Sequence, residues 1–122
     1  MGQPPSGTGP ALDREAMTAE MTRTTFQRRV VTRLAPDDVL ERAIAFFQAR
    51  GYRAGRTGRP HQVYVIGKAE GTLPRVTAEI LAQPNVGRGG VTLVTVSGFG
   101  PRLREHLAAF VQELRRERRS SP

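Results

Sequence analysis

The chain contains no cysteine, and this absence removes several kinds of chemistry. Without thiols there can be no disulfide, no thiolate nucleophile and no cysteine-ligated zinc. No apolar run approaches the roughly 20 residues that a membrane-spanning helix needs. The N-terminus also lacks a basic region followed by an apolar one, which a secretory signal requires. We therefore expect a cytoplasmic protein.

Recognisable catalytic, metal-binding and nucleotide-binding motifs are missing as well. The two histidines, His61 and His106, have neither an i,i+4 partner nor a nearby carboxylate pattern, so we expect structural or surface roles for both. Asp37 and Asp38 fit the first turn of a helix, where the macrodipole favours negative charge. Residues 66–72 resemble a phosphate loop only superficially, since the first glycine and the Ser or Thr after the lysine are absent. We predict no catalytic residue, no cofactor and no metal, and therefore no enzyme.

Lysine occurs once, at Lys68, yet the 122-residue chain has a formal net charge of +8. The charge therefore comes from arginine, whose planar guanidinium suits phosphate and carboxylate groups. A basic excess favours polyanionic partners, such as nucleic acid or an acidic protein. A GC-rich genome would enrich arginine without any such role. We favour this second interpretation, because the basic residues are spread along the chain.

Bulky apolar side chains are scarce over residues 1–22, which are rich in proline, glycine and small polar residues. Such a stretch buries too little apolar surface to offset the entropy lost on ordering. We predict a disordered tail over residues 1–22, a single domain over residues 23–119 and a frayed end over residues 120–122. About a hundred ordered residues bury one core and leave little room for an enclosed active site.

What the sequence does contain is a succession of patterned segments. Period-two alternation predicts strands, and helical periodicity predicts helices. The strands fall at residues 24–34, 52–56, 61–68, 75–83 and 91–98, and the helices at residues 36–50 and 100–118. The order β-α-β-β-β-β-α predicts an α+β fold, with a single curved antiparallel sheet packed by two helices, the C-terminal one long.

This order of elements over residues 24–118 resembles that of the TATA-binding-protein half-domain and of the larger helix-grip ligand carriers. In those folds a curved antiparallel sheet wraps around a long C-terminal helix. The resemblance implies a fold and assigns no functional residue, because no diagnostic motif of either family occurs in the chain.

Arginines on two of the predicted segments indicate a candidate contact surface. They are Arg29 and Arg33 on the first strand, and Arg53, Arg56 and Arg59 on the hairpin. If the first strand paired with the hairpin, these arginines would form one basic surface for a polyanion or a protein partner. Tyr64, on the second hairpin strand, is the aromatic residue best placed to stack on a base.

The sequence thus predicts a small non-enzymatic binding module. The first hypothesis is an accessory or protein-interaction domain, whose partner is another protein or a second copy of the chain. The second is non-specific RNA or DNA binding through the arginines. The third is a carrier of a small apolar ligand between the sheet and the C-terminal helix, because residues 91–96 are apolar on both faces.

Overall fold

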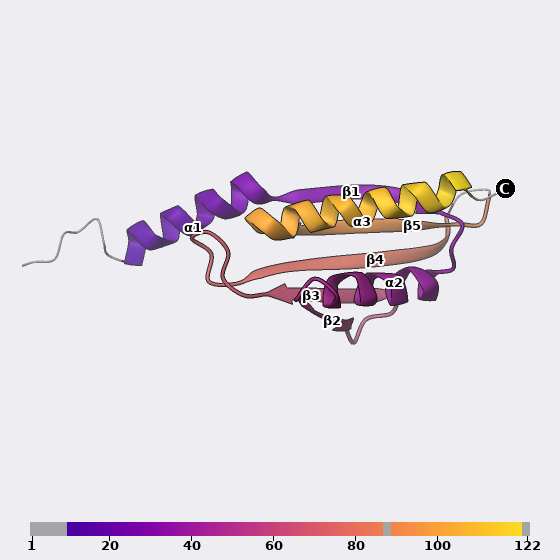
Figure 1. Cartoon of the computed structure of the whole chain (residues 1–122), viewed down its shortest axis with the longest axis horizontal. Coiled ribbons are helices and arrows are strands. Elements are labelled where there is room, and N and C mark those ends of the chain that lie inside the picture. The colour runs from indigo at the N-terminus through magenta and orange to yellow at the C-terminus, as the bar shows by residue number, and fades with distance from the viewer. Residues whose placement is uncertain (1–9, 87–88, 121–122) are drawn as a thin grey trace, which may run out of the picture.

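A computed structural model describes residues 10–86 and 89–120 (Figure 1). The elements are α1 (Pro10–Thr24), β1 (Phe26–Thr32), α2 (Pro36–Gln48), β2 (Arg53–Arg56), β3 (Gln62–Gly67), β4 (Val76–Val86), β5 (Val91–Phe99) and α3 (Pro101–Ser120). From β1 onward this is the predicted β-α-β-β-β-β-α order, and the α+β prediction is confirmed.

All five strands belong to one antiparallel sheet, in the order β1-β5-β4-β3-β2. Strands β2 to β5 form a meander, in which each strand pairs with the next. β1 pairs with β5, so the first strand lies beside the last one and β1 and β2 are the two opposite edges. α3 packs on β1 and β5, and α2 packs on β2, β3 and β4, both on the same face of the sheet (Figure 1).

Local sequence fixes both ends of α2. Pro36 occupies the start of the helix, where its restricted φ is already helical. Gly51 follows the end with a φ of 89°, a conformation that residues with a side chain rarely adopt. The Tyr52 N–H donates to the Phe47 carbonyl oxygen at 3.0 Å, and the two rings pack edge to face. The helix stops here and the chain turns directly into β2.

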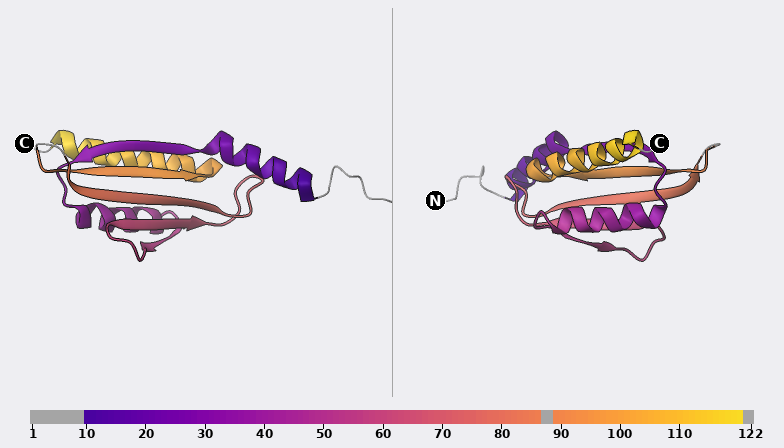
Figure 2. Two further views of the ribbon diagram at one scale, coloured as in Figure 1. Left: turned by 180° about the vertical axis from the view of Figure 1, so that it is seen from behind. Right: turned by 45° about the vertical axis from the view of Figure 1, so that its right-hand side comes forward.

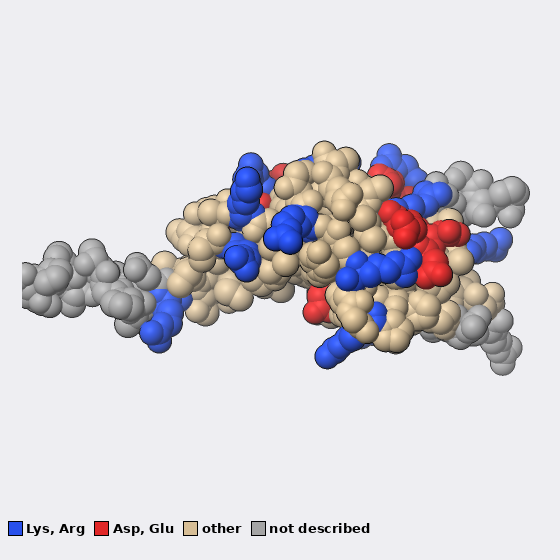
Figure 3. Space-filling view, turned by 90° about the horizontal axis from the view of Figure 1, so that it is seen from below, with Lys and Arg blue, Asp and Glu red and all other residues tan. Residues whose placement is uncertain are grey.

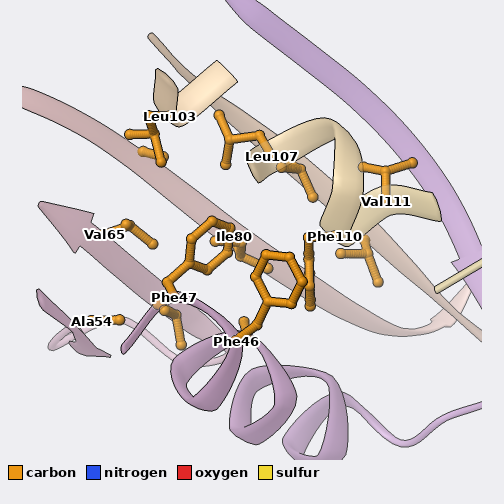
Figure 4. Packing of buried hydrophobic residues seen from close by; sticks show 14 of the residues in the cluster. Phe46, Phe47, Ala54, Val65, Ile80, Leu103, Leu107, Phe110 and Val111 are labelled. Atoms are coloured by element: carbon orange, nitrogen blue, oxygen red, sulfur yellow. The ribbon is translucent and has the colours of Figure 1, made fainter. Parts of the chain in front are cut away.

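A single hydrophobic core fills the space between the sheet and the two helices. Phe46 and Phe47 of α2 point towards Phe110 of α3, with ring centroids 5.3 Å and 5.7 Å from the Phe110 centroid (Figure 4). Leu107 of α3 and Ile80 of β4 complete this contact and are fully buried. Each such side chain stabilises the fold by about 1.5–3 kcal/mol relative to an exposed one.

Several predicted boundaries differ from the structure, most of them by one or two residues. Residues 10–22, which the sequence predicts as part of a disordered tail, belong to α1 in the structure, and residues 1–9 lie outside the described residues. β4 continues to Val86, past the predicted end at residue 83, through an irregularity in its pairing with β5. α3 includes Ser120, which was predicted to fray, while residues 121 and 122 lie outside the described residues.

Candidate functional site

The two groups of arginines predicted to form one surface lie on opposite edges of the sheet. Arg29 is on β1 and Arg33 follows it, whereas Arg53 and Arg56 are on β2 and Arg59 is in the turn after it. Three strands separate β1 from β2, so the pairing on which the common surface depended does not occur. Alternation reports which face of a strand is apolar, but it does not report which strand lies beside it.

Arg56 is held by carboxylates of the same chain. Its guanidinium bonds Asp37 and Glu41 of α2, each at 3.2 Å. The hydrogen bonds to Asp37 and then to Glu41 raise the pKa of Arg56 above its ordinary value. Both acidic residues lie near the start of α2. On the face seen in Figure 3, several acidic side chains gather at one end, beside basic ones. Arg56 is thus less available to a partner than Arg53.

The second face of the sheet carries no helix among the described residues (Figure 2, left). We call this surface the open face. Its apolar and aromatic side chains are half-buried by their neighbours and come from four strands. They are Val31 of β1, Val91 and Leu93 of β5, Leu81 of β4, and Tyr64 and Ile66 of β3. β5 is apolar on both sides because it lies inside the sheet, with one side against the core and the other on the open face.

Polar side chains cross the middle of the open face as a hydrogen-bonded row. The Thr57 hydroxyl donates to the Gln62 side-chain oxygen at 2.9 Å, and the Gln62 amide donates to Glu79 at 2.7 Å. Tyr64 lies directly across the strand pair from Glu79. Arg29 and Arg53 stand on the same face, at its two edges. The open face therefore combines apolar positions with a fixed polar row and a cationic margin.

A hollow of about 380 Å³ opens at one end of the open face, beside the start of β2 and the connection between β3 and β4. We call it the basic pocket. Its lining consists of Gly51, Arg53, Ile66, Gly67, Lys68, Ala69, Pro74 and Arg75. Three of these residues are cationic and none is acidic.

Beside the basic pocket lies a buried carboxylate that sequence reasoning missed. Glu70 is 5% exposed, and one of its oxygens accepts from the backbone N–H groups of Arg102 and Leu103 at 2.8 Å and 3.0 Å. The other oxygen accepts from the Tyr52 hydroxyl at 2.7 Å. Burial, and then the hydrogen bond to Glu70, raise the pKa of Tyr52. Glu70 thus caps the start of α3 and its three hydrogen bonds account for it without catalysis.

The two histidines lie apart from each other and each has a different setting. The His106 ring packs edge to face on Tyr52, at 5.6 Å between centroids. His61 precedes β3 with a φ of 59°, and its buried Nδ1 has no hydrogen-bond partner among the described residues. Over residues 10–86 and 89–120, no group of three or more His, Asp or Glu side chains is arranged to hold a metal ion.

Comparison with protein-family models, with curated proteins and with solved structures finds no match for this chain. In the part of the chain that the structure describes, every helix is too short or too polar to cross a lipid bilayer.

Proposed function

We propose that this chain is a small non-enzymatic binding module, an accessory or protein-interaction domain that docks a protein on its open face. The observation that carries the proposal is the absence of a helix over this face among the described residues, although it bears partly exposed apolar side chains. Val31 and Leu93 are paired across β1 and β5, so they form a continuous apolar contact rather than isolated positions.

The chemistry of the open face indicates what a partner must offer. An apolar patch would cover the half-buried side chains, and carboxylates at its margin would meet Arg29 and Arg53 at the sheet edges. Such an arrangement, apolar at the centre and charged at the rim, is typical of protein interfaces. The Gln62 amide already donates to Glu79, and a partner that covers this point has to supply donors for the remaining lone pairs of the carboxylate.

The proposal is tested by capture from native lysate together with light scattering of the purified chain. We expect a partner, or a second copy, to bind the wild type and to bind Leu93→Glu at least about tenfold more weakly, because a carboxylate would be buried in the contact. Ala109→Glu, at an exposed position of α3 on the opposite side, is the matched control and should bind as the wild type does. A chain that stays monomeric and partnerless, or equal loss in both variants, would refute the proposal.

RNA or DNA binding is the second candidate function, and Tyr64 is the observation that favours it. Its ring lies on the open face, half-buried, with Arg29 and Arg53 on the same face. An antiparallel sheet that presents an aromatic ring and cations can stack a base and contact phosphates. A plot of the logarithm of the affinity against the logarithm of the salt concentration should then fall with a slope of about one for each phosphate contacted. If no complex forms with a labelled oligonucleotide at low salt, this candidate function is ruled out.

The remaining hypotheses have less support. The side chains of Phe47, Leu107 and Phe110 occupy the space between the sheet and α3 where an apolar ligand would have to lie, so we do not propose a carrier. The resemblance to the TATA-binding-protein half-domain and the helix-grip carriers stays a proposal, and the order of the elements is what supports it. A cytoplasmic location stays a prediction from the N-terminal sequence.

A further inference from the structure

The basic pocket gathers three cations that are distant in the sequence. Arg53 is the first residue of β2, Lys68 directly follows β3, and Arg75 directly precedes β4. Among the described residues, none of these side chains has an ion pair or a hydrogen bond. Arg56, on the same strand as Arg53, shows the contrast, since two carboxylates neutralise it. The pocket therefore holds positive charge without a counter-ion from the described chain.

The connection that carries Lys68 and Arg75 is held in a fixed shape. Glu70 and Leu73 exchange both backbone hydrogen bonds at 2.9 Å, which closes the turn and brings its two ends together. The carboxylate of Glu70 then ties this turn to Tyr52 and to the start of α3. Because the turn is anchored in the core, the backbone that carries Lys68 and Arg75 is held in place before any ligand binds, although both side chains are exposed.

The pocket is built from backbone as well as charge. Gly67 lines the pocket with backbone, and its missing side chain leaves room on the core side, where a Cβ would lie 2.6 Å from the Tyr52 ring. Ile66, Ala69 and Pro74 add apolar surface beside the cations. The volume of about 380 Å³ lies in the range of small-molecule sites and exceeds what a bare inorganic anion would fill.

We propose that the basic pocket binds a phosphate ester, with Arg53, Lys68 and Arg75 on the phosphate and the apolar wall on the organic group. Arginine forks bond phosphate oxygens in pairs, and lysine adds a point charge. The phosphate can belong to a free nucleotide or phosphorylated metabolite, or to a nucleic-acid chain that enters the pocket. This site shares Arg53 and Ile66 with the open face, but neither proposal rests on the other.

The test uses the full chain, AMP and inorganic phosphate as free probes, and a labelled single-stranded oligonucleotide as the polymeric probe. Lys68→Gln with Arg75→Gln removes two pocket cations and leaves Arg53 and the rest of the open face intact. Arg104→Gln with Arg115→Gln, at exposed positions of α3, is the control with the same loss of charge. Thermal unfolding of both double variants verifies that they fold.

We expect a phosphate-bearing probe to bind the wild type at low salt and to bind the pocket variant at least about tenfold more weakly, while the control stays within about twofold. Binding of AMP, displaced by inorganic phosphate, identifies a free ester as the ligand. Binding of the oligonucleotide alone, with the same loss in the pocket variant, identifies a nucleic-acid chain. The proposal would be overturned if none of the probes binds the wild type. It would also be overturned if the pocket variant and the control variant weaken binding equally.

Discussion

Glu70 supplies at the residue scale what α3 lacks in its own sequence. The helix begins at Pro101 and has no acidic residue in its first turn, and Gly100 before it has no side chain to cap the free N–H groups. The carboxylate of Glu70 takes their place from a turn 32 residues earlier. It stabilises the helix start both by hydrogen bonding and by its charge against the helix dipole.

Replacing Glu70 with alanine should therefore lower the free energy of unfolding by about 2–4 kcal/mol, because two helix N–H groups and the Tyr52 hydroxyl lose their acceptor. Glu70→Gln keeps an oxygen acceptor and should cost less. Glu105→Ala, an exposed position of α3, serves as the control and should stay within about 0.5 kcal/mol in urea unfolding. If Glu70→Ala unfolds like this control, Glu70 does not cap the helix.

Tyr52 predicts how stability depends on alkaline pH. Its folded-state pKa is raised above the ordinary value of 10.0, so the group contributes stability that is complete below pH 10 and is lost as pH rises above it. The phenolate absorbance of the wild type should show a late component, from Tyr52, above pH 10. In Tyr52→Phe the late component should vanish. A Tyr52 phenolate that forms near pH 10 in the folded chain would contradict this assignment.

Little in the sequence predicts that Glu70 caps α3. Gly100 and Pro101 predict a helix start, but the Ser, Thr, Asp or Asn that usually caps one is missing. That gap indicates a cap from elsewhere, yet nothing in the sequence says from where. The pocket cations Arg53, Lys68 and Arg75 could not be grouped either, because their proximity depends on a turn closed through Glu70 and Leu73.

At the scale of elements, the patterns within a segment were informative and the contacts between segments were not. Period-two alternation located the strands, and the apolar stripes located α2 and α3. Both signals are local in the sequence. The strand beside β1 could not be predicted this way, and the pairing with the hairpin that the common basic surface required does not occur. α1 was missed for a related reason. It has no strong apolar stripe, and it is anchored by Thr24, whose hydroxyl accepts from the Gly100 N–H at 3.0 Å.

The β4–β5 pairing contains the closest backbone approach that a substitution can test. A Cβ on Gly98 would lie 2.5 Å from the Cβ of Ala78 and 2.7 Å from the Thr77 carbonyl oxygen, so Gly98→Ala should destabilise the chain by about 1–3 kcal/mol. Gly58, in the β2–β3 turn, has open space at the same position, and Gly58→Ala should change stability by less than about 0.5 kcal/mol. Equal melting temperatures for the two variants would show that β4 and β5 do not approach in this way.

For the whole molecule, one connected core predicts one unfolding transition. The helices α2 and α3 and all five strands contribute to the same cluster of buried side chains, so no part of the described fold has a core of its own. Tyr52 reports on the junction of the two helices and Tyr64 on the open face. Tyrosine fluorescence of Tyr52→Phe and of Tyr64→Phe should each melt together with the helical circular dichroism of the same variant. Separated midpoints would indicate two independent units.

The position of β1 and β2 at the two edges has a consequence for assembly by backbone pairing. Each edge strand has unpaired amide and carbonyl groups that could accept a further strand, which is how sheets grow into fibrils. Here Arg28 and Arg29 lie on one edge, and Arg53 and Arg56 on the other. A neighbouring chain that added its own strand would have to bring guanidinium groups together and strip them of water. We therefore expect the arginines at the two edges to oppose the addition of a further strand and so to disfavour fibril growth.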